Sequence, residues 1–418
     1  FSNAIDLNAI AFTYDIDIQI YTYLVKHFNK YSKENELNIT LHLNLITTSN
    51  STSEINYYGS MLESLLLKHD VKYDFIFYDN IYSSRYGPHL LSLNELLTKR
   101  HINMYNTEIT KQSCSYQDKL VGLPIMLDYS VLYSNKNLLK KYNKKIPKTW
   151  NELVETAKYI LKEETKHNNT ELMAYNGLFT NTEIGTCSLY EFIYSYRKSK
   201  ESPFPELLSQ EVINALEMIK KMKNDISSDT QFQLPWGYTV GKLHEDNANV
   251  LFLKYWYYSN INPLFNVTAL PGNKEGISGS TIGGYNLGIN KYINENKKKA
   301  CIDAFTYMTS KYMQTKIVKE KGLLSAISEI YNDDEICIHV DCEFFKSIQP
   351  IARPTNKIND YTKYSENFRN YIYEFLYGNI TSYEVLKKIN DITKIYYISI
   401  NSEDTPYVLD CDPSWINN

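Results

Sequence analysis

The beginning of the chain alternates between strand patterns and helix patterns. A short apolar run at residues 9–13 predicts a buried strand, and apolar side chains spaced three or four apart over residues 18–31 predict an amphipathic helix. Residues 38–45 alternate apolar and polar positions, as a half-buried strand does. A second helix pattern begins at Ser53, and the apolar run at residues 73–78 is typical of a parallel-sheet strand. Strands that alternate with helices in this way predict an α/β lobe.

Polar side chains follow two of these predicted strands. Tyr14 and Asp15 come after the first strand, and Asp79 and Asn80 come after the strand at residues 73–78. In open α/β sheets, ligands lie beyond the carboxyl ends of the strands. We therefore expect these residues on one rim of a ligand site, with a helix cap as the alternative role of Asp79.

The most specific pattern covers residues 119–160. It begins with a strand at residues 121–124, continues through an extended run at residues 130–133, and then changes to two helices. Thr149 and Glu152 form a capping box at the start of the second helix. This order resembles the family 1 extracellular solute-binding proteins of ABC importers, the maltodextrin-type group. In that family, the segment after the Gly-Leu-Pro strand crosses between two lobes beside the ligand.

The resemblance continues through the rest of the chain. A predicted strand at residues 249–254 is followed by the aromatic run 255–258, as in the family's strand that finishes at the ligand. Residues 278–290 resemble the glycine-glycine-aromatic strand that returns to the first lobe. A long helix pattern at residues 297–321, which ends at a glycine cap, and a closing segment at residues 352–392 complete the match.

The resemblance implies an α/β protein with the two-lobed periplasmic-binding-protein-like II fold, a hinge and an interlobe cleft. We expect the chain to cross between the lobes near Leu127 and again near Gly279. The expected boundaries are residues 1–126 with 279–328 for lobe one, 127–278 with 329–400 for lobe two, and 401–418 for a C-terminal tail. Lobes of this kind close around their ligand.

Aromatic and polar residues near the crossings are the candidates for ligand binding. Sugars present apolar C–H faces, which aromatic rings cover, and hydroxyl groups, which carboxylates, amides and arginine bond. Trp256 matches the family's stacking tryptophan, with core packing as its alternative role. Tyr285 could pack at the hinge instead, and Arg353 could simply hold a lobe in place. The complete set of candidates is Trp256, Tyr285, Asp128, Tyr129, Asp79, Asn80, Tyr14, Asp15, Arg353 and Gly284.

Composition and motifs favour binding over catalysis. A formal net charge of −4 without a basic stripe argues against nucleic acid as a partner. No apolar run approaches the roughly 20 residues of a membrane span. The sequence lacks a P-loop, a G-x-S-x-G elbow and an H-E-x-x-H motif. We therefore expect no catalytic residue, no metal and no cofactor, and a small-molecule or oligosaccharide ligand that is bound non-covalently.

Two other functions stay open. One is a secreted enzyme acting on polysaccharide, which needs two carboxylates across a cleft. The other is a binding module of the same fold for amino acids or peptides, which usually clamps the ligand with an arginine and an aspartate. Arg353 is the one arginine that the sequence places near the cleft, and this disfavours the amino-acid option.

The cysteines are too far apart for a zinc site. Cys337 and Cys342 are close enough to close a small disulfide loop, and an extracellular setting would permit it. Cys114 with Cys187 is a weaker pairing. Cys301 falls within a helix pattern and is expected as a buried thiol.

Glycosylation sequons and the high asparagine content indicate a secreted eukaryotic glycoprotein. The sequons are at Asn38, Asn50, Asn168, Asn266 and Asn379. Modules similar to the resembled family occur as ectodomains of class C-like seven-helix receptors. We therefore expect a chain that is extracellular or at the cell surface, reached through the secretory pathway. It would serve sensing or signalling in a G protein-coupled receptor, which could form a dimer, and would touch the membrane only through segments outside this chain.

Overall fold

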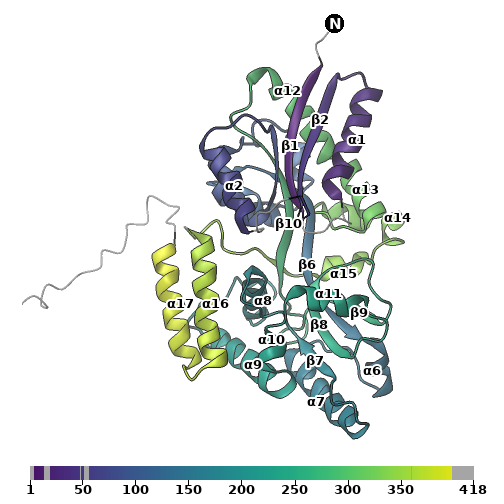
Figure 1. The fold of residues 1–418 in the computed structure, drawn as a ribbon, viewed down its shortest axis with the longest axis vertical. Helices are drawn as coiled ribbons and strands as arrows, with labels where there is room; N and C mark the ends of the chain where they lie inside the picture. Colours follow the sequence, from purple (N-terminus) through teal and green to yellow (C-terminus); the bar gives the residue numbers. More distant parts are fainter. Residues whose placement is uncertain (1–3, 14–18, 48, 51–55, 359, 398–418) are drawn as a thin grey trace, which may run out of the picture.

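The computed structural model describes residues 4–13, 19–47, 49–50, 56–358 and 360–397, and these residues form two α/β lobes (Figure 1). The expected fold class is therefore confirmed. Lobe one occupies the upper part of Figure 1 and lobe two the lower part. Tyr14, Asp15 and the expected tail at residues 401–418 lie outside the described residues.

Lobe one is built on a mixed sheet with the strand order β2-β1-β3-β10-β6. Its strands are β1 (Ile5–Thr13), β2 (Ile39–Thr47), β3 (Phe75–Asp79), β10 (Ser280–Ile289) and the first half of β6 (Leu123–Asn135). β1 pairs in parallel with β2 and β3, whereas β10 is antiparallel to β3 and to β6. The strands that the first third of the sequence predicts are all present, with shifted ends.

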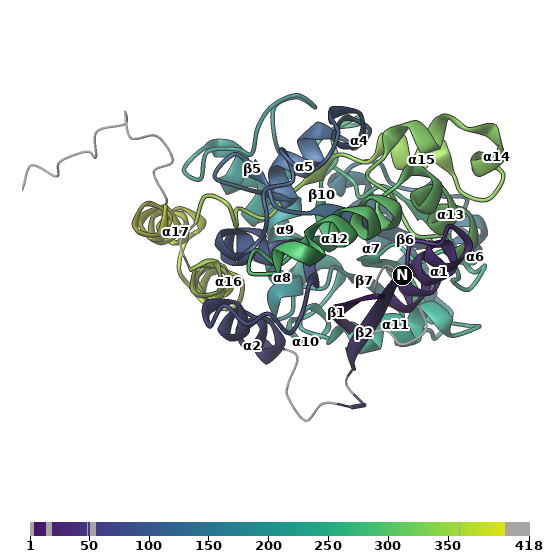
Figure 2. The same ribbon diagram turned by 90° about the horizontal axis from the view of Figure 1, so that it is seen from above.

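Helices cover both faces of this sheet. Successive residues of a strand point to opposite sides. Leu7 and Ala9 of β1 therefore share a core with α1 (Ile20–Glu34), whereas Ile10 and Phe12 share one with α2 (Asn56–Leu67). Figure 2 shows α1 and α2 on opposite sides of β1 and β2.

The long helix predicted at residues 297–321 is two helices, α12 (Glu295–Met308) and α13 (Lys311–Lys321). The prediction was wrong because Ser310 starts a new helix: its hydroxyl accepts a hydrogen bond from the N–H of Met313 at 3.2 Å. The predicted C-terminal cap is confirmed, since Gly322 ends α13 in the left-handed region with a φ of 62°.

Lobe two is built around the second half of β6. β8 (Val250–Trp256) lies beside it and carries β7 (Met173–Asn176), and β9 (Phe265–Thr268) also pairs with β6. The helices of this lobe are α6 (Lys136–Lys141), α7 (Trp150–Lys166), α8 (Glu183–Tyr194), α9 (Gln210–Ile226), α10 (Asp229–Phe232), α11 (Trp236–His244), α16 (Tyr361–Tyr377) and α17 (Ser382–Tyr396). The predicted capping box of Thr149 and Glu152 is present at the start of α7.

β6 is one continuous strand that belongs to both sheets. From Leu123 to Tyr129 it pairs with β10, and from Ser130 to Asn135 it pairs with β8 and β9. The sequence predicts two separate extended runs here, and the structure joins them through Leu127, where a crossing is expected. β6 and β10 run side by side between the lobes in Figure 1.

The segment between α13 and α16 changes the expected lobe boundaries. Ile330, Val340 and Phe345 are buried in the core of lobe one, although residues 329–400 were assigned to lobe two. After this segment, Ile358 is the first residue that is buried in the core of lobe two. The boundary was placed too early because the strand–helix alternation stops after α13, and the short elements that follow carry too little periodicity to assign.

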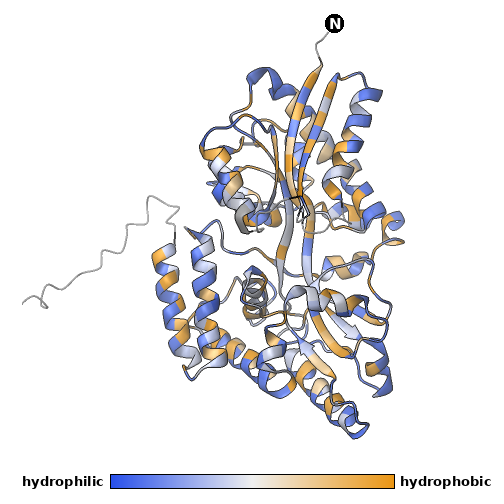
Figure 3. Cartoon of the chain, in the orientation of Figure 1, coloured by the Kyte–Doolittle hydropathy of each residue, from blue (hydrophilic) through white to orange (hydrophobic). Residues whose placement is uncertain are grey.

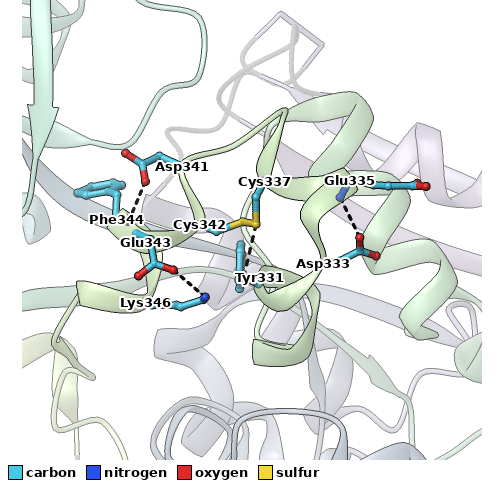
Figure 4. Close-up of a disulfide and its surroundings, with 9 residues drawn as sticks. All are labelled: Tyr331, Asp333, Glu335, Cys337, Asp341, Cys342, Glu343, Phe344 and Lys346. Carbon is cyan, nitrogen blue, oxygen red and sulfur yellow. Dashed lines mark hydrogen bonds and ion pairs between the residues drawn. A yellow bond between two sulfur atoms is a disulfide. The ribbon is translucent and has the colours of Figure 1, made fainter.

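A disulfide joins Cys337 to Cys342, as predicted, between α14 (Asp334–Cys337) and α15 (Cys342–Ser347). Figure 4 shows it close to Tyr331. Cys114 and Cys187 are both free and buried, so their proposed pairing was wrong. They lie in different lobes: Cys114 is in the core of lobe one, and Cys187 is in α8 of lobe two. Cys301 is a buried free thiol, as predicted.

Helices in both lobes have one apolar face turned inward. Figure 3 shows hydrophobic and hydrophilic segments alternating along α1 and α17. In α17 the apolar residues of the buried face are Val385, Leu386, Ile389 and Ile392. Within the ranges that the structure describes, no helix has both the length and the apolar character needed to cross a membrane.

Candidate functional site

Trp256, Gly283 and Asp128 meet where β6 changes partners between the two sheets. Gly283 of β10 pairs with Asp128 of β6, and Ser130, two residues further along β6, pairs with Trp256 of β8. Paired residues and residues two apart share one face of a sheet. A β-carbon built on Gly283 would lie 2.9 Å from Cζ3 of Trp256 and 3.3 Å from Cβ of Asp128. The indole therefore lies over the glycine, beside the carboxyl group.

Asp128 is a half-buried carboxyl group in an electrostatically unusual setting. Burial raises its pKa well above the ordinary value, and the negative charge of Asp79 raises it further. The backbone N–H of Tyr129 and the charge of Lys254 oppose this rise. A carboxyl group that holds its proton more tightly can both donate and accept hydrogen bonds, which suits ligand hydroxyl groups.

A buried ion pair between Lys254 and Glu191 lies next to Trp256. Nζ of Lys254 lies 2.9 Å from Oε1 of Glu191 and 3.0 Å from Oγ of Ser188, and both charged side chains are only 3% exposed. The same ammonium group lies 5.5 Å from the ring centroid of Trp256. The other oxygen of Glu191 accepts a hydrogen bond from the N–H of Thr281 at 2.9 Å. The pair thus joins α8 to β8 and β10.

Arg353 brings a second set of polar residues together. Its Nη2 donates to Oδ1 of Asp79 at 3.1 Å and to Oδ1 of Asn80 at 3.0 Å. Its Nη1 donates to Oε1 of Glu183 at 3.1 Å. Arg353 is 5% exposed, whereas Asp79 and Glu183 keep about a third of their side-chain surface exposed. Burial raises the pKa of Asp79, and the charge of Arg353 opposes that rise.

Tyr285 lies between these two sets. It is two residues from Gly283 along β10, and it pairs with Asp79 of β3. The half-buried ring packs on the core of lobe one, 5.6 Å from the ring of Tyr21 at an interplanar angle of 77°. Gly284 has a φ of 106°, and a β-carbon there would lie 2.3 Å from the carbonyl oxygen of Met126. The absence of a side chain at Gly284 therefore lets the backbone of β10 lie close to the backbone of β6.

Tyr129 is not brought to this site. Tyr129 follows Asp128 directly on β6, so its side chain points to the opposite face of the strand. It is 7% exposed within the core of lobe one, and it lines a separate cavity of about 140 Å³ with Tyr331 and Phe345. Asn80 is brought to Arg353 but is buried, and its amide donates to the carbonyl of Ile282 at 3.2 Å.

Several site residues were missed by sequence reasoning. Glu183 begins α8, five residues before the helix that the sequence predicts from Ser188. Tyr361 donates to Glu183 from α16, far along the chain. Lys254 did leave a signal, because it is a lone charge within the buried strand β8. A lone buried cation needs an anionic partner, but only the fold identifies that partner as Glu191.

The chemistry of the site is that of hydrogen bonding and ring stacking. An indole face, a half-buried aspartate and partly exposed carboxylates suit a ligand with apolar faces and many hydroxyl groups. Across the residues that the structure describes, no set of three or more histidine, cysteine, aspartate or glutamate side chains is arranged to hold a metal ion.

Comparisons with known proteins connect this arrangement to a family. A family model described as bacterial extracellular solute-binding protein matches residues 78–341. The chain is similar to a probable ABC transporter-binding protein of Deinococcus radiodurans, with 26% identity over 318 residues, which are 71% of this chain and 74% of that protein.

Two solved structures share the fold. One is maltose-bound MalE3 of T. maritima, with a TM-score of 0.72 and 21% identity over 94% of this chain and 100% of that chain. The other is a cyclic alpha-maltosyl-1,6-maltose binding protein from Arthrobacter globiformis, with a TM-score of 0.72 and 14% identity over 94% of this chain and 100% of that chain.

Proposed function

Because the chain belongs to the bacterial extracellular solute-binding proteins, we propose that it binds a carbohydrate non-covalently between its two lobes and closes on it. The observation that carries this proposal is the position of Trp256 over Gly283 and beside Asp128. The ring would cover one apolar face of a sugar, while the carboxyl group would bond its hydroxyl groups.

The similar structures support a sugar as the ligand. One is described as maltose-bound, and the other is named for binding a cyclic maltosyl-maltose. We propose a glucose-based oligosaccharide as the first ligand to test, delivered to an ABC importer outside the cytoplasm. The receptor-ectodomain hypothesis, with its signalling role and dimer, rests on the sequons and the asparagine content, and the relatives described above do not add to it.

An amino-acid ligand is disfavoured by the bonds of Arg353. An amino-acid site needs an arginine whose guanidinium is available to the ligand carboxylate. In this structure Asp79, Asn80 and Glu183 already accept hydrogen bonds from both Nη atoms of Arg353. Binding of an amino acid would have to displace at least one of them.

Calorimetry with maltotriose and leucine tests the proposal. We expect maltotriose to bind and to raise the melting temperature, because a ligand that binds only the folded state stabilises it, and we expect leucine to do neither. Chromatography of the maltotriose after incubation should recover it intact. Shortened products would favour the polysaccharide-acting enzyme, and binding of leucine alone would favour the amino-acid module.

A further inference from the structure

Arg353 lies on a third connection between the lobes. It follows β11 (Pro350–Ile351), which pairs with β10 at Ser280 and Thr281, and it precedes α16 of lobe two. One end of its guanidinium is bound to lobe one through Asp79 and Asn80, and the other end is bound to lobe two through Glu183. The side chain therefore bridges the two lobes while being almost completely buried.

The lobe-one partners of Arg353 are themselves fixed. Asp79 accepts a hydrogen bond from the N–H of Ile81 at 3.0 Å, as the N-cap of a short helix does. Asn80 is held by the backbone carbonyl of Ile282 in β10. Neither side chain can follow the guanidinium without breaking a second hydrogen bond.

The lobe-two partner is fixed more firmly. Glu183 accepts hydrogen bonds from the hydroxyl of Tyr361 at 2.6 Å and from the hydroxyl of Ser365 at 2.6 Å. Nη1 of Arg369 lies 3.7 Å from the same carboxylate. Glu183 is therefore held by α16, and a rotation of lobe two would move the carboxylate as a rigid part of that lobe.

We propose that Arg353 is the bridge that sets the resting angle between the lobes, and that it raises ligand affinity by favouring the closed arrangement. A rotation that opens the lobes must lengthen the bonds on one side of the guanidinium, because its planar fork cannot follow both anchors. Opening then leaves charged groups poorly paired within the protein, which is costly. The statement about affinity rests on the proposed function, whereas the statement about the angle does not.

The test uses the whole chain and the variants Arg353→Met, Arg353→Lys and Glu183→Gln. Without ligand, small-angle scattering should give a larger radius of gyration for Arg353→Met than for the wild type. Arg353→Lys keeps the charge but can reach one anchor at a time, so it should fall between the two. Kd for maltotriose should rise roughly 5- to 150-fold in Arg353→Met, the usual range of coupling between sites.

Arg85→Met is the matched control, because Arg85 pairs with Glu63 entirely within lobe one. It should leave the radius of gyration and Kd unchanged. A merely structural role would lower the melting temperature of Arg353→Met but leave the radius of gyration of the folded protein unchanged, and that result overturns the proposal. If Arg353→Met does not fold, Arg353→Lys and Glu183→Gln decide the question, and unchanged scattering in both overturns it.

The two proposals can fail separately. If maltotriose does not bind the wild type, the carbohydrate proposal fails, while the scattering of the unliganded variants still tests the bridge. If maltotriose binds but the scattering of all variants matches the wild type, the bridge is refuted and the carbohydrate proposal stands.

Discussion

Trp256 of β8 lies over Gly283 of β10 across the intervening strand β6, so closely that a β-carbon on the glycine would lie 2.9 Å from the indole ring. Gly283 is therefore required for the position of the ring, and not only for the path of β10. The pair also explains why the aromatic residue and the glycines occur together: the glycine provides the space that the ring occupies.

Gly283→Ala should displace the indole and weaken carbohydrate binding. Overpacking of this kind costs roughly 1–3 kcal/mol. If the indole ring moves to relieve it, the affinity for the sugar should fall by about 5- to 150-fold. Calorimetry with maltotriose measures the effect. Gly241→Ala, where an added β-carbon meets nothing within 4 Å, is the control and should bind normally. Equal affinity of both variants would show that the ring position does not matter.

Trp256→Ala should remove the stacking surface. Losing the contact of a sugar face with an indole costs roughly 1.5–3 kcal/mol, or about 10- to 150-fold in Kd. Trp150 is the matched control, because it is 2% exposed, stacks on Phe192 at 4.2 Å and donates to Oγ of Ser195 at 2.8 Å. Trp150→Ala should lower the melting temperature more than the affinity. The opposite pattern would place Trp256 in the core and move the site elsewhere.

Acid should weaken lobe two through Glu164. Burial alone would raise the pKa of this carboxyl group, but hydrogen bonds from Lys141, Tyr142 and Asn169 lower it to about 2. A pKa below that of the unfolded chain means that the group adds stability above about pH 4.5, and that this stability is lost as the pH falls toward 2. A pKa that falls from 4.5 to about 2 should contribute roughly 3 kcal/mol near neutral pH, since one pKa unit is about 1.4 kcal/mol.

Urea melts of the wild type and Glu164→Gln at pH 7 and pH 3 test this expectation. The stability difference between the two proteins should shrink at the lower pH. Glu163→Gln is the control: its carboxylate pairs with Lys166 on the surface, so the change should have little effect. A difference between wild type and Glu164→Gln that is the same at both pH values would contradict the assignment.

Reduction of the Cys337–Cys342 disulfide should destabilise lobe one. By loop-closure entropy, a loop this short contributes about 2 kcal/mol. Cys337→Ser with Cys342→Ser should therefore lower the melting temperature by a few degrees, and dithiothreitol should do the same to the wild type. The double variant should not respond to dithiothreitol. An identical response of both proteins would mean that dithiothreitol does not act through this disulfide, and would contradict the prediction.

Local signals in the sequence predicted the parts of the fold that depend on neighbours in the chain. The capping box at Thr149 and the glycine cap at Gly322 need only residues a few positions apart, and both are present. The break at Ser310 was overlooked because apolar spacing continues across it. Tyr129 was grouped with Asp128 against the period of two in a strand, which the sequence alone could have shown.

The site itself depends on contacts between residues that lie far apart in the sequence. Arg353 reaches Asp79 across 274 positions and Glu183 across 170 positions. No local pattern distinguishes these carboxylates from the many others in the chain. Lys254 was recognisable as an anomaly within a buried strand, but its pairing with Glu191 follows from the packing of α8 on the sheet.

The position of β10 has a consequence for how the protein is made. β10 lies between β3 and β6, so β3 has an uncovered edge until the ribosome has added Ile289. The core of lobe two is completed later, because it includes Phe368 of α16 and Ile389 of α17. Neither lobe can therefore finish folding before these later segments have been made, and until then the open edge of β3 can pair with a strand of another chain.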